Sequence, residues 1–301
     1  MRILILSRNQ SLYSTQSLLR ACYRRGHYAR VVDHLLCDLV VEKNSLEIYY
    51  QGGKISDYDA VIPRVGSSVT LYGTNVMRQL EMMGTFSVTP ADSMLKTRNK
   101  WMCYQILASE GIPIPKSFLP NFAQMDEQQI RNNFDEPLII KMLESTHGLG
   151  VILSESYNNA FSTIEAFYRM RESVLVQEYI KESRGTDIRV LVVDDKIVAS
   201  MKRQAREGEF RSNLHRGATA MAEKLSEEEM FLARKVCKLL NLHVAGVDIL
   251  RSKDGPLVLE VNSSPGLEGI ETVTGIDVSG QIIKFIERQI KKREKYLMRK
   301  A

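Results

Sequence analysis

Short apolar runs alternate with amphipathic stretches over the first ninety residues. Four runs are short enough to be buried strands, and the stretches at residues 11–25 and 71–83 repeat their apolar positions with the period of a helix. Strands that alternate with helices are typical of a small parallel α/β domain. We therefore expect such a domain over residues 1–92. Its strands are expected at Arg2–Leu6, His27–Val32, Asp59–Pro63 and Phe86–Thr89.

The pattern changes after residue 92, because strands now follow one another across short turns. Ser226 and Glu229 have the spacing of a capping box and open one of the helices. Antiparallel strands with separate helices are typical of α+β folds. We expect two such subdomains, at residues 93–180 and 181–288, and a basic tail at 289–301. Helices are expected at 93–110, 157–170 and 226–240, and strands at Leu138–Lys141, Val151–Ser154, Val174–Tyr179, 188–202 (a hairpin), Val244–Arg251 and Leu257–Asn262.

The last of these hairpins carries the strongest chemical signal. If Arg251 lies opposite Leu257, then Asp248 lies opposite Glu260, and directly opposed side chains share one face of the sheet. Asn262 lies two residues further along and shares that face. Two carboxylates and an amide oxygen suit Mg²⁺, which takes oxygen ligands. The alternative is a carboxylate pair that is solvated at a sheet edge or matched by arginines.

A glycine loop and two lysines suggest a phosphate site. The loop Thr146–Gly150 joins two strands, and Gly148 and Gly150 would let backbone N–H groups approach phosphates. No Gly-Lys-Ser/Thr follows, so the loop is a candidate flap and not a Walker P-loop. Lys141 ends an apolar strand and requires an anionic partner or a route to water. A plain hairpin turn and surface lysines, Lys100 included, are the alternatives.

Two further polar segments suggest the rest of a nucleotide site. The irregular run Phe210–Gly217 contains arginine, asparagine and histidine, and Arg189 and Arg203 lie on the preceding hairpin. Arginines stabilise a transferring phosphoryl group and a developing oxyanion. The strand that ends at residues 177–180 offers its backbone to an adenine, and Asp187 offers a carboxylate to a ribose. A polar surface loop is the alternative interpretation of the arginine run.

Composition excludes several other classes of protein. The four cysteines are far apart and form no CxxC pair, which argues against zinc and redox motifs and suits a reducing cytoplasm. The apolar run at the N-terminus is too short for a signal peptide or a membrane span, so a cytoplasmic protein without a membrane partner is expected. The net charge of +5 is partly concentrated at residues 291–300. We interpret this cluster as a solvated helix end and not as a nucleic-acid site.

Taken in order, these pieces resemble an ATP-grasp ligase, and most of all the RimK branch, the ribosomal-protein glutamate ligases. The likeness covers nearly the whole chain to about residue 288. The glycine loop departs from the family's usual Glu-Gly-Thr-Gln-Gly-Ile-Gly, because Ser145 and His147 replace a glycine and a glutamine. The runs that carry the resemblance are MRILILSRN, DAVIPRVG, LVQEYIKES, DIRVLVV, EGEFRSNLHRG, VAGVDILR and LEVNSSPGLEGIE.

The resemblance implies roles for the residues that match the family pattern. Lys100, Lys141 and the flap glycines would contact ATP phosphates. Glu178 and Tyr179 would border the adenine, and Asp187 the ribose. Asp248, Glu260 and Asn262 would hold two magnesium or manganese ions, with Glu260 bridging. The residues expected to face phosphates or the reacting carboxylate are Arg211, Ser212 and Asn213, and those expected to steady the oxyanion are Arg203 and Arg211.

The implied activity is ligation of glutamate to the C-terminus of a ribosomal protein, the sixth of the small subunit, through an acyl phosphate. A homo-oligomer is also expected. The nearest alternative is the same chemistry on a small metabolite, such as a glutathione-like peptide or a coenzyme glutamyl tail. A non-catalytic nucleotide-binding regulator is a rival from another class, and steady ADP release that requires an amino acid would separate the two. A dehydrogenase is disfavoured, since no GxGxxG follows the first strand.

Overall fold

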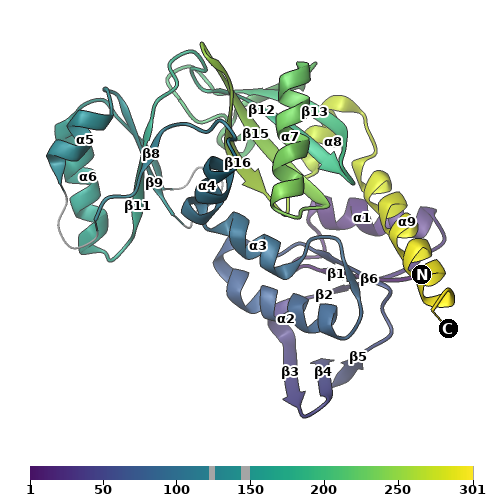
Figure 1. Ribbon diagram of the computed structural model, residues 1–301. Helices are drawn as coiled ribbons and strands as arrows, with labels where there is room; N and C mark the ends of the chain where they lie inside the picture. Colours follow the sequence, from purple (N-terminus) through teal and green to yellow (C-terminus); the bar gives the residue numbers. More distant parts are fainter. Residues whose placement is uncertain (122–125, 144–149, 301) are drawn as a thin grey trace.

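A four-stranded parallel sheet organises the N-terminal part of the chain (Figure 1). The computed structural model describes residues 1–121, 126–143 and 150–300. The strand order is β2-β1-β6-β7, and side chains of β1 alternate between two cores, with Ile3 and Ile5 on one face and Leu4 and Leu6 on the other. The elements are β1 (Arg2–Leu6), α1 (Tyr13–Arg24), β2 (Tyr28–Val32), β6 (Ala60–Pro63), α2 (Thr70–Met82) and β7 (Phe86–Ser87).

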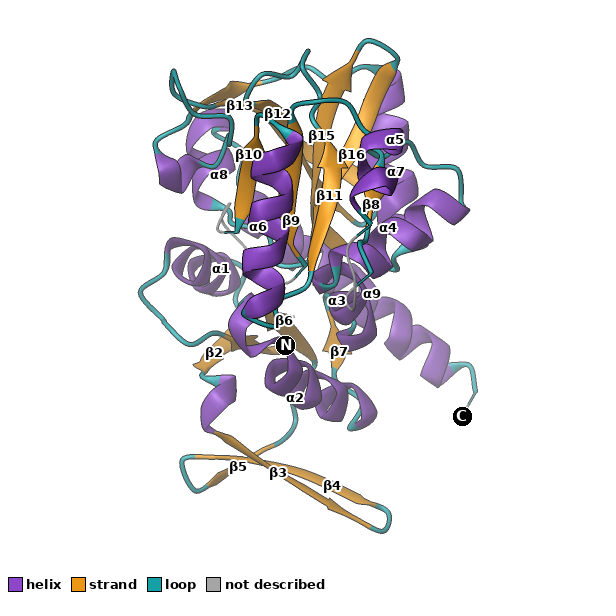
Figure 2. Ribbon diagram, turned by 90° about the vertical axis from the view of Figure 1, so that its left-hand side faces the viewer, coloured by secondary structure: helices purple, strands orange, loops and turns teal. Residues whose placement is uncertain are grey.

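The sequence patterns gave no indication of a small antiparallel sheet between β2 and β6. It projects from the N-terminal part as an arm (Figure 2). Only Ile48, Ile55 and Cys37 of its apolar residues are fully buried, while Val41 is 72% exposed. The adjacent apolar residues Val40 and Val41 obscure the alternation that identifies a strand. Its strands are β3 (Cys37–Glu42), β4 (Ser45–Tyr50) and β5 (Gly53–Ile55).

The single helix expected at residues 93–110 is wrong, since two helices meet at Asn99. Asn99 leaves the helical conformation (φ −85°, ψ 103°), and its side chain accepts a hydrogen bond from the backbone N–H of Met102 at 2.9 Å. Asparagine is a favoured N-cap, so it ends α3 (Ala91–Arg98) and starts α4 (Lys100–Ser109). The break places Lys100 in the first turn of α4.

The central part is a four-stranded antiparallel sheet of order β10-β9-β11-β8, with two helices packed against it (Figure 1). Phe161 and Ile164 of α6 lie in one core with Ile140 of β9 and Val176 of β11. The predicted strands here are confirmed to within one residue. The elements are β8 (Ser117–Phe118), α5 (Glu127–Asn133), β9 (Leu138–Met142), β10 (Val151–Ser154), α6 (Tyr157–Arg169) and β11 (Val174–Glu178).

A five-stranded antiparallel sheet of order β14-β13-β12-β15-β16 forms the C-terminal part. The predicted capping box is present, because Ser226 and Glu229 each accept the other's backbone N–H. Helix α9 runs unbroken from Val278 to Met298, so the basic residues after 288 are its last turns. The remaining elements are β12 (Thr186–Val193), β13 (Lys196–Gln204), β14 (Thr219–Ala222), α7 (Glu227–Leu239), β15 (Val244–Ser252), β16 (Gly255–Asn262) and α8 (Glu268–Thr274).

Helix α9 packs against both the N-terminal part and the C-terminal sheet. Phe285 and Ile282 of α9 share a core with Leu18 of α1 and with Leu191 of β12, and α9 lies along α1 in Figure 1. None of the described helices has the length and apolar run that crossing a bilayer requires. The observed fold therefore confirms the predicted class: a parallel α/β unit followed by antiparallel α+β units.

Candidate active site

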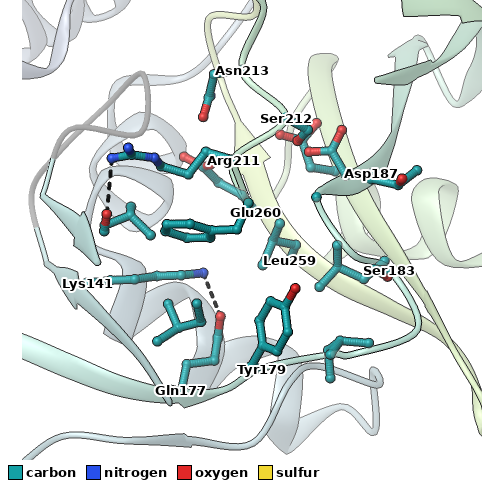
Figure 3. Close-up of a pocket in the computed structure, with 18 of the residues that line it drawn as sticks. Lys141, Gln177, Tyr179, Ser183, Asp187, Arg211, Ser212, Asn213, Leu259 and Glu260 are labelled. Carbon is teal, nitrogen blue, oxygen red and sulfur yellow. Dashed lines mark hydrogen bonds between the residues drawn. The ribbon is translucent and has the colours of Figure 1, made fainter. Parts of the chain in front are cut away.

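One pocket collects most of the predicted site residues from distant parts of the chain (Figure 3). It lies between the central sheet and the C-terminal sheet. Gly148 lies outside the described residues. Gly150 precedes the lining residue Val151 and has a φ of +66°, and a side chain there would collide with Met142, so glycine is required. The predicted residues that line the pocket are Lys100, Lys141, Glu178, Tyr179, Asp187, Arg203, Arg211, Ser212, Asn213, Asp248 and Glu260.

Lys141 is a buried cation on the floor of this pocket. It is only 8% exposed, and its Nζ donates a 2.5 Å hydrogen bond to Oε1 of Gln177 on the neighbouring strand β11 (Figure 3). Burial lowers the pKa of Lys141 to about 8, and Glu260 opposes the shift. A buried ammonium without a paired carboxylate is expensive. An anionic ligand in the pocket would relieve that cost.

Gln177 is a site residue that sequence reasoning missed. It accepts from Lys141 and donates to the hydroxyls of Tyr104 (3.1 Å) and Ser117 (2.8 Å). This fixes the orientation of its amide and therefore the position of Lys141. The available signal was a polar residue, 1% exposed, directly after the apolar run Val174–Val176.

The end of β11 forms the opposite, more apolar side of the pocket. The Glu178 carboxylate accepts a 2.7 Å hydrogen bond from the backbone N–H of Lys116, so this side chain holds the linker. Tyr179 and the residues after it leave the strand and line the pocket. A flat base would fit against the apolar side chains of this wall. The apolar lining residues are Ile139, Ile180, Leu250 and Leu259.

Asp187, Arg203, Asp248 and Arg189 form a buried network of charges. Arg203 lies opposite Asp187 in the β12–β13 register, and Arg189 lies opposite Asp248 in the β12–β15 register. Arg203 bonds both carboxylates, and its Nη2 lies 3.0 Å from Oδ2 of Asp248. Burial disfavours the charged form of Asp248, but Arg189 and Arg203 hold its pKa below the usual range. Each charge therefore depends on its neighbours.

The predicted pairing of Asp248 with Glu260 is confirmed, but the register behind it is wrong. Arg251 lies opposite Pro256, and a β-bulge at Leu259 restores the pairing. The bulge breaks the alternation of β16, so Leu259 and Glu260 both line the pocket. Asn262 lies opposite Gly246 on the same face as Glu260 and lines an adjoining pocket that shares Glu260 and Lys100.

These three side chains fit a hard divalent cation. Within the described residues, the Glu260 carboxylate has no hydrogen bond or ion pair. Among the described residues, the only donor to Oδ1 of Asp248 is Nε of Arg189, at 2.8 Å, which leaves one lone pair. The amide nitrogen of Asn262 faces Oδ2 of Asp248 at 3.5 Å, so its oxygen remains available. Two carboxylate oxygens and one amide oxygen are the donors that Mg²⁺ and Mn²⁺ accept.

Glu209, another residue that sequence reasoning missed, orders the arginine run. Its carboxylate bonds Arg211 at 2.9 Å and Arg216 at 3.2 Å. The hydrogen bonds from Arg211 chiefly lower the pKa of Glu209 to about 2. Arg211 also donates to the carbonyl of Val151 at 3.2 Å (Figure 3). This loop is therefore attached to β10, at the edge of the glycine loop.

Comparison with known proteins agrees with this geometry. Residues 1–94 match the model of the RimK PreATP-grasp domain, and residues 97–286 match that of the RimK-like ATP-grasp domain. A probable alpha-L-glutamate ligase of Vibrio atlanticus is 50% identical over 291 residues, which are 97% of each chain. A protein of the same description from Trichodesmium erythraeum is 49% identical over 97% of this chain and 98% of its own.

Solved structures share the fold at low sequence identity. The ATP-grasp ligase PsnB, complexed with a minimal precursor, superposes with a TM-score of 0.74 at 20% identity, covering 96% of this chain and 98% of that one. A RimK domain protein from Sphaerobacter thermophilus has a TM-score of 0.71 at 22% identity, covering 95% and 99%. The domain models span almost the whole described fold and site, and the chain belongs to the RimK family of ATP-grasp ligases.

Proposed function

We propose that this enzyme uses ATP and Mg²⁺ or Mn²⁺ to ligate glutamate to an acceptor carboxylate. The proposal rests on the pocket itself. There the buried Lys141 lies near strands β15 and β16, which carry the carboxylates of Asp248 and Glu260. The relatives described as alpha-L-glutamate ligases support glutamate as the amine. A PsnB structure that contains Mg and ADP supports the nucleotide and the metal for the shared fold.

Some of the pocket residues would bind the nucleotide, and others would bind the metal ions. Lys141 and Lys100 would bind phosphate oxygens, and Tyr179 would border the adenine. Asp187 would border the ribose, although Arg203 already holds its carboxylate. Arg211, Ser212 and Asn213 would face the phosphate end. Asp248, Glu260 and Asn262 would hold two metal ions, which would supply charge neutralisation at the transferring phosphoryl group.

The reaction would proceed in two steps. An oxygen of the acceptor carboxylate attacks the γ-phosphorus, and the bond to ADP breaks, which gives an acyl phosphate. The deprotonated amine of glutamate then attacks the carbonyl carbon, the C–N bond forms, and phosphate leaves. Arg211, which lines the pocket beside Ser212 and Asn213, would steady the tetrahedral oxyanion, and Arg203 would hold two carboxylates of the site. A closed pocket would keep water from the acyl phosphate.

Replacing Lys141 with alanine is expected to weaken ATP binding by about 1.5–3 kcal/mol, the range for a hydrogen bond to a charged group. Bound phosphate favours the protonated lysine, whose pKa without ligand is about 8. ATP affinity of the wild type should therefore fall as the pH rises through about 8, and the alanine variant should lose that dependence. Calorimetric titration at several pH values measures both effects. An unchanged dissociation constant would show that Lys141 does not contact ATP.

We propose the C-terminus of the sixth small-subunit ribosomal protein as the acceptor and an α-linked glutamate tail as the product. Incubation of that protein with enzyme, ATP, magnesium and glutamate should give a ladder of masses, each separated by one glutamyl residue. The same protein without its last few residues should stay unmodified. Rapid ligation of glutamate to a small metabolite, with both forms of the ribosomal protein untouched, would contradict this acceptor.

A further inference from the structure

Three arginines converge beside the metal-binding face, outside the nucleotide pocket. Arg8 follows β1, Arg64 follows β6, and Arg98 ends α3. Arg98 donates to the carbonyl of Val65 at 2.6 Å, and Arg64 donates to the carbonyl of Pro265 at 2.8 Å. The guanidinium of Arg8 lies against the same loop, next to Gly66. Three positive groups therefore surround one short loop.

This cluster has no carboxylate partner among the described residues, which distinguishes it from the arginines of the nucleotide pocket. Arg203 and Arg211 both form ion pairs, whereas Arg8, Arg64 and Arg98 form none with the residues that the structure describes. Nε of Arg98 is buried and has no hydrogen-bond partner in the described part of the chain. Burial, reinforced by Arg98, lowers the pKa of Arg64 to about 10, and burial also lowers the pKa of Arg98, although Glu260 opposes that shift. Arg64 and Arg98 are half-buried, and a positive charge with reduced access to water is costly, so a bound anion would lower this cost.

The sheet topology independently marks this place as a ligand site. The chain leaves β1 for β2 on one side and returns to β6 on the other, so the strand order reverses between β1 and β6. Ligands of open α/β sheets bind outside the carboxyl ends of the strands at such a switch point. Arg8 and Arg64 come directly after the two strands that flank it.

The cluster also opens toward the reacting groups. Arg98 lines the second pocket together with Thr70 and Asn262, and this pocket shares Lys100 and Glu260 with the nucleotide pocket. A substrate that fills the second pocket would place one end at the metal face and the other at Arg98. Substrates of the proposed ligase are long enough to do so, because glutamate and an acidic peptide each carry a second carboxylate.

We propose that Arg98, supported by the positive charge of Arg64 and Arg8, binds a substrate carboxylate that is not itself phosphorylated. The inference rests on the proposed function for the identity of the substrates. A guanidinium fork matches the two oxygens of a carboxylate, and the side chain of Arg98 lines the second pocket, where such a carboxylate would bind. The carboxylate belongs either to the incoming glutamate or to an acidic residue of the acceptor chain.

Replacing Arg98 with alanine is expected to raise the KM of one of these substrates by about 10- to 100-fold, the equivalent of one charge-assisted hydrogen bond. The KM for ATP should stay unchanged. Arg78→Ala is the matched control, because Arg78 lies on α2 of the same unit and, among the described residues, bonds to the exposed Asp92 and Asn75. Arg98→Lys keeps the positive charge but lacks the forked guanidinium, so its KM should lie between those of the wild type and Arg98→Ala.

Two arms identify the source of the carboxylate. One compares glutamate with glutamine as the amine, and the other compares an acceptor peptide ending in glutamate with one ending in glutamine. Arg98→Ala should abolish the preference for glutamate over glutamine in one of these two comparisons. The comparison that changes identifies the substrate whose carboxylate Arg98 binds, and this result supports the subsite. An unchanged preference and unchanged KM values in both arms would overturn it. A wild type inactive in both arms would instead contradict the proposed function.

A folding defect is separated from a binding defect by two measurements. Calorimetric ATP binding and the midpoint of thermal unfolding should match the wild type in Arg98→Ala. If that variant does not fold, Arg8→Ala is the substitute, because Arg8 is exposed and contributes to no core. It should raise the same KM by a smaller factor, and no rise at all would overturn the subsite.

Discussion

Replacing Glu260 with glutamine is expected to lower kcat by about 10³-fold, because charge neutralisation by a metal contributes several kcal/mol and about 4 kcal/mol corresponds to that factor. The amide keeps the shape of the side chain and removes one negative charge. Glu260 has no hydrogen bond or ion pair within the described residues, so its role points to a ligand and not to the fold. The thermal unfolding midpoint of the variant should therefore equal or exceed that of the wild type.

The matched control for this substitution is Glu268→Gln. Glu268 belongs to the same sequence run, is exposed, and lies in the first turn of α8. It should leave both kcat and stability nearly unchanged. Binding of Mn²⁺, followed by its paramagnetic effect on solvent relaxation, provides a second measurement that does not depend on turnover. Normal turnover and normal Mn²⁺ binding in Glu260→Gln would refute the assignment of the metal site.

Replacing Arg203 with leucine is expected to destabilise the protein by about 3–5 kcal/mol, the cost of removing one partner from a buried ion pair. Arg203 is 4% exposed and bonds both Asp187 and Asp248, which are 4% and 2% exposed. The substitution removes the arginine partner of the Asp187 carboxylate. It also removes one of the two arginines that pair with Asp248, so that Arg189 remains. The resemblance predicts that Arg203 steadies the oxyanion, whereas its two ion pairs favour a role in supporting the structure of the site.

Chemical denaturation measures this effect, and Arg211→Leu is its control. Arg211 is more exposed and pairs with Glu209 at the pocket edge, so its loss should cost much less stability and more activity.

The stability that Asp248 contributes has a defined pH dependence. Its pKa is depressed in the folded state, so this contribution is present above the unfolded pKa of about 3.9 and is lost as the pH falls through the folded value. A stable but inactive Arg203→Leu would restore the catalytic interpretation.

The parts of the fold that the sequence predicted are those with regular periodicity. The strands around Ile3–Ile5 and Ile139–Ile140 are continuous apolar runs, and in the hairpin that carries Asp248 the two acidic residues stand out between apolar neighbours. The bulge at Leu259 could not be predicted, since the energy of a one-residue insertion depends on what Leu259 and Tyr104 contact in three dimensions. The pairing was right because the bulge compensates for a register that was one residue off.

Site residues were predictable where their chemistry stood out from the local pattern. Lys141 after an apolar strand is such a case, and Gln177 offered the same signal without being recognised. Glu209 and Arg98 offered none, because each is one charged residue among several: Glu209 acquires its role through the nearby Arg211 and Arg216, and Arg98 through partners distant in sequence. Arg98 contacts Val65 across 33 positions, and its pocket is completed by β16. Tertiary contacts of this kind leave no periodic pattern of residues in the sequence.

Steady-state ADP release, measured with and without glutamate in the presence of the acceptor protein, distinguishes a glutamate ligase from a nucleotide-binding regulator. A glutamate ligase should release ADP steadily only when both glutamate and the acceptor are present, and Glu260→Gln should lose this release. A nucleotide-binding regulator would release no ADP above background under any of these conditions. ADP release at the same rate with and without glutamate would likewise contradict a glutamate ligase.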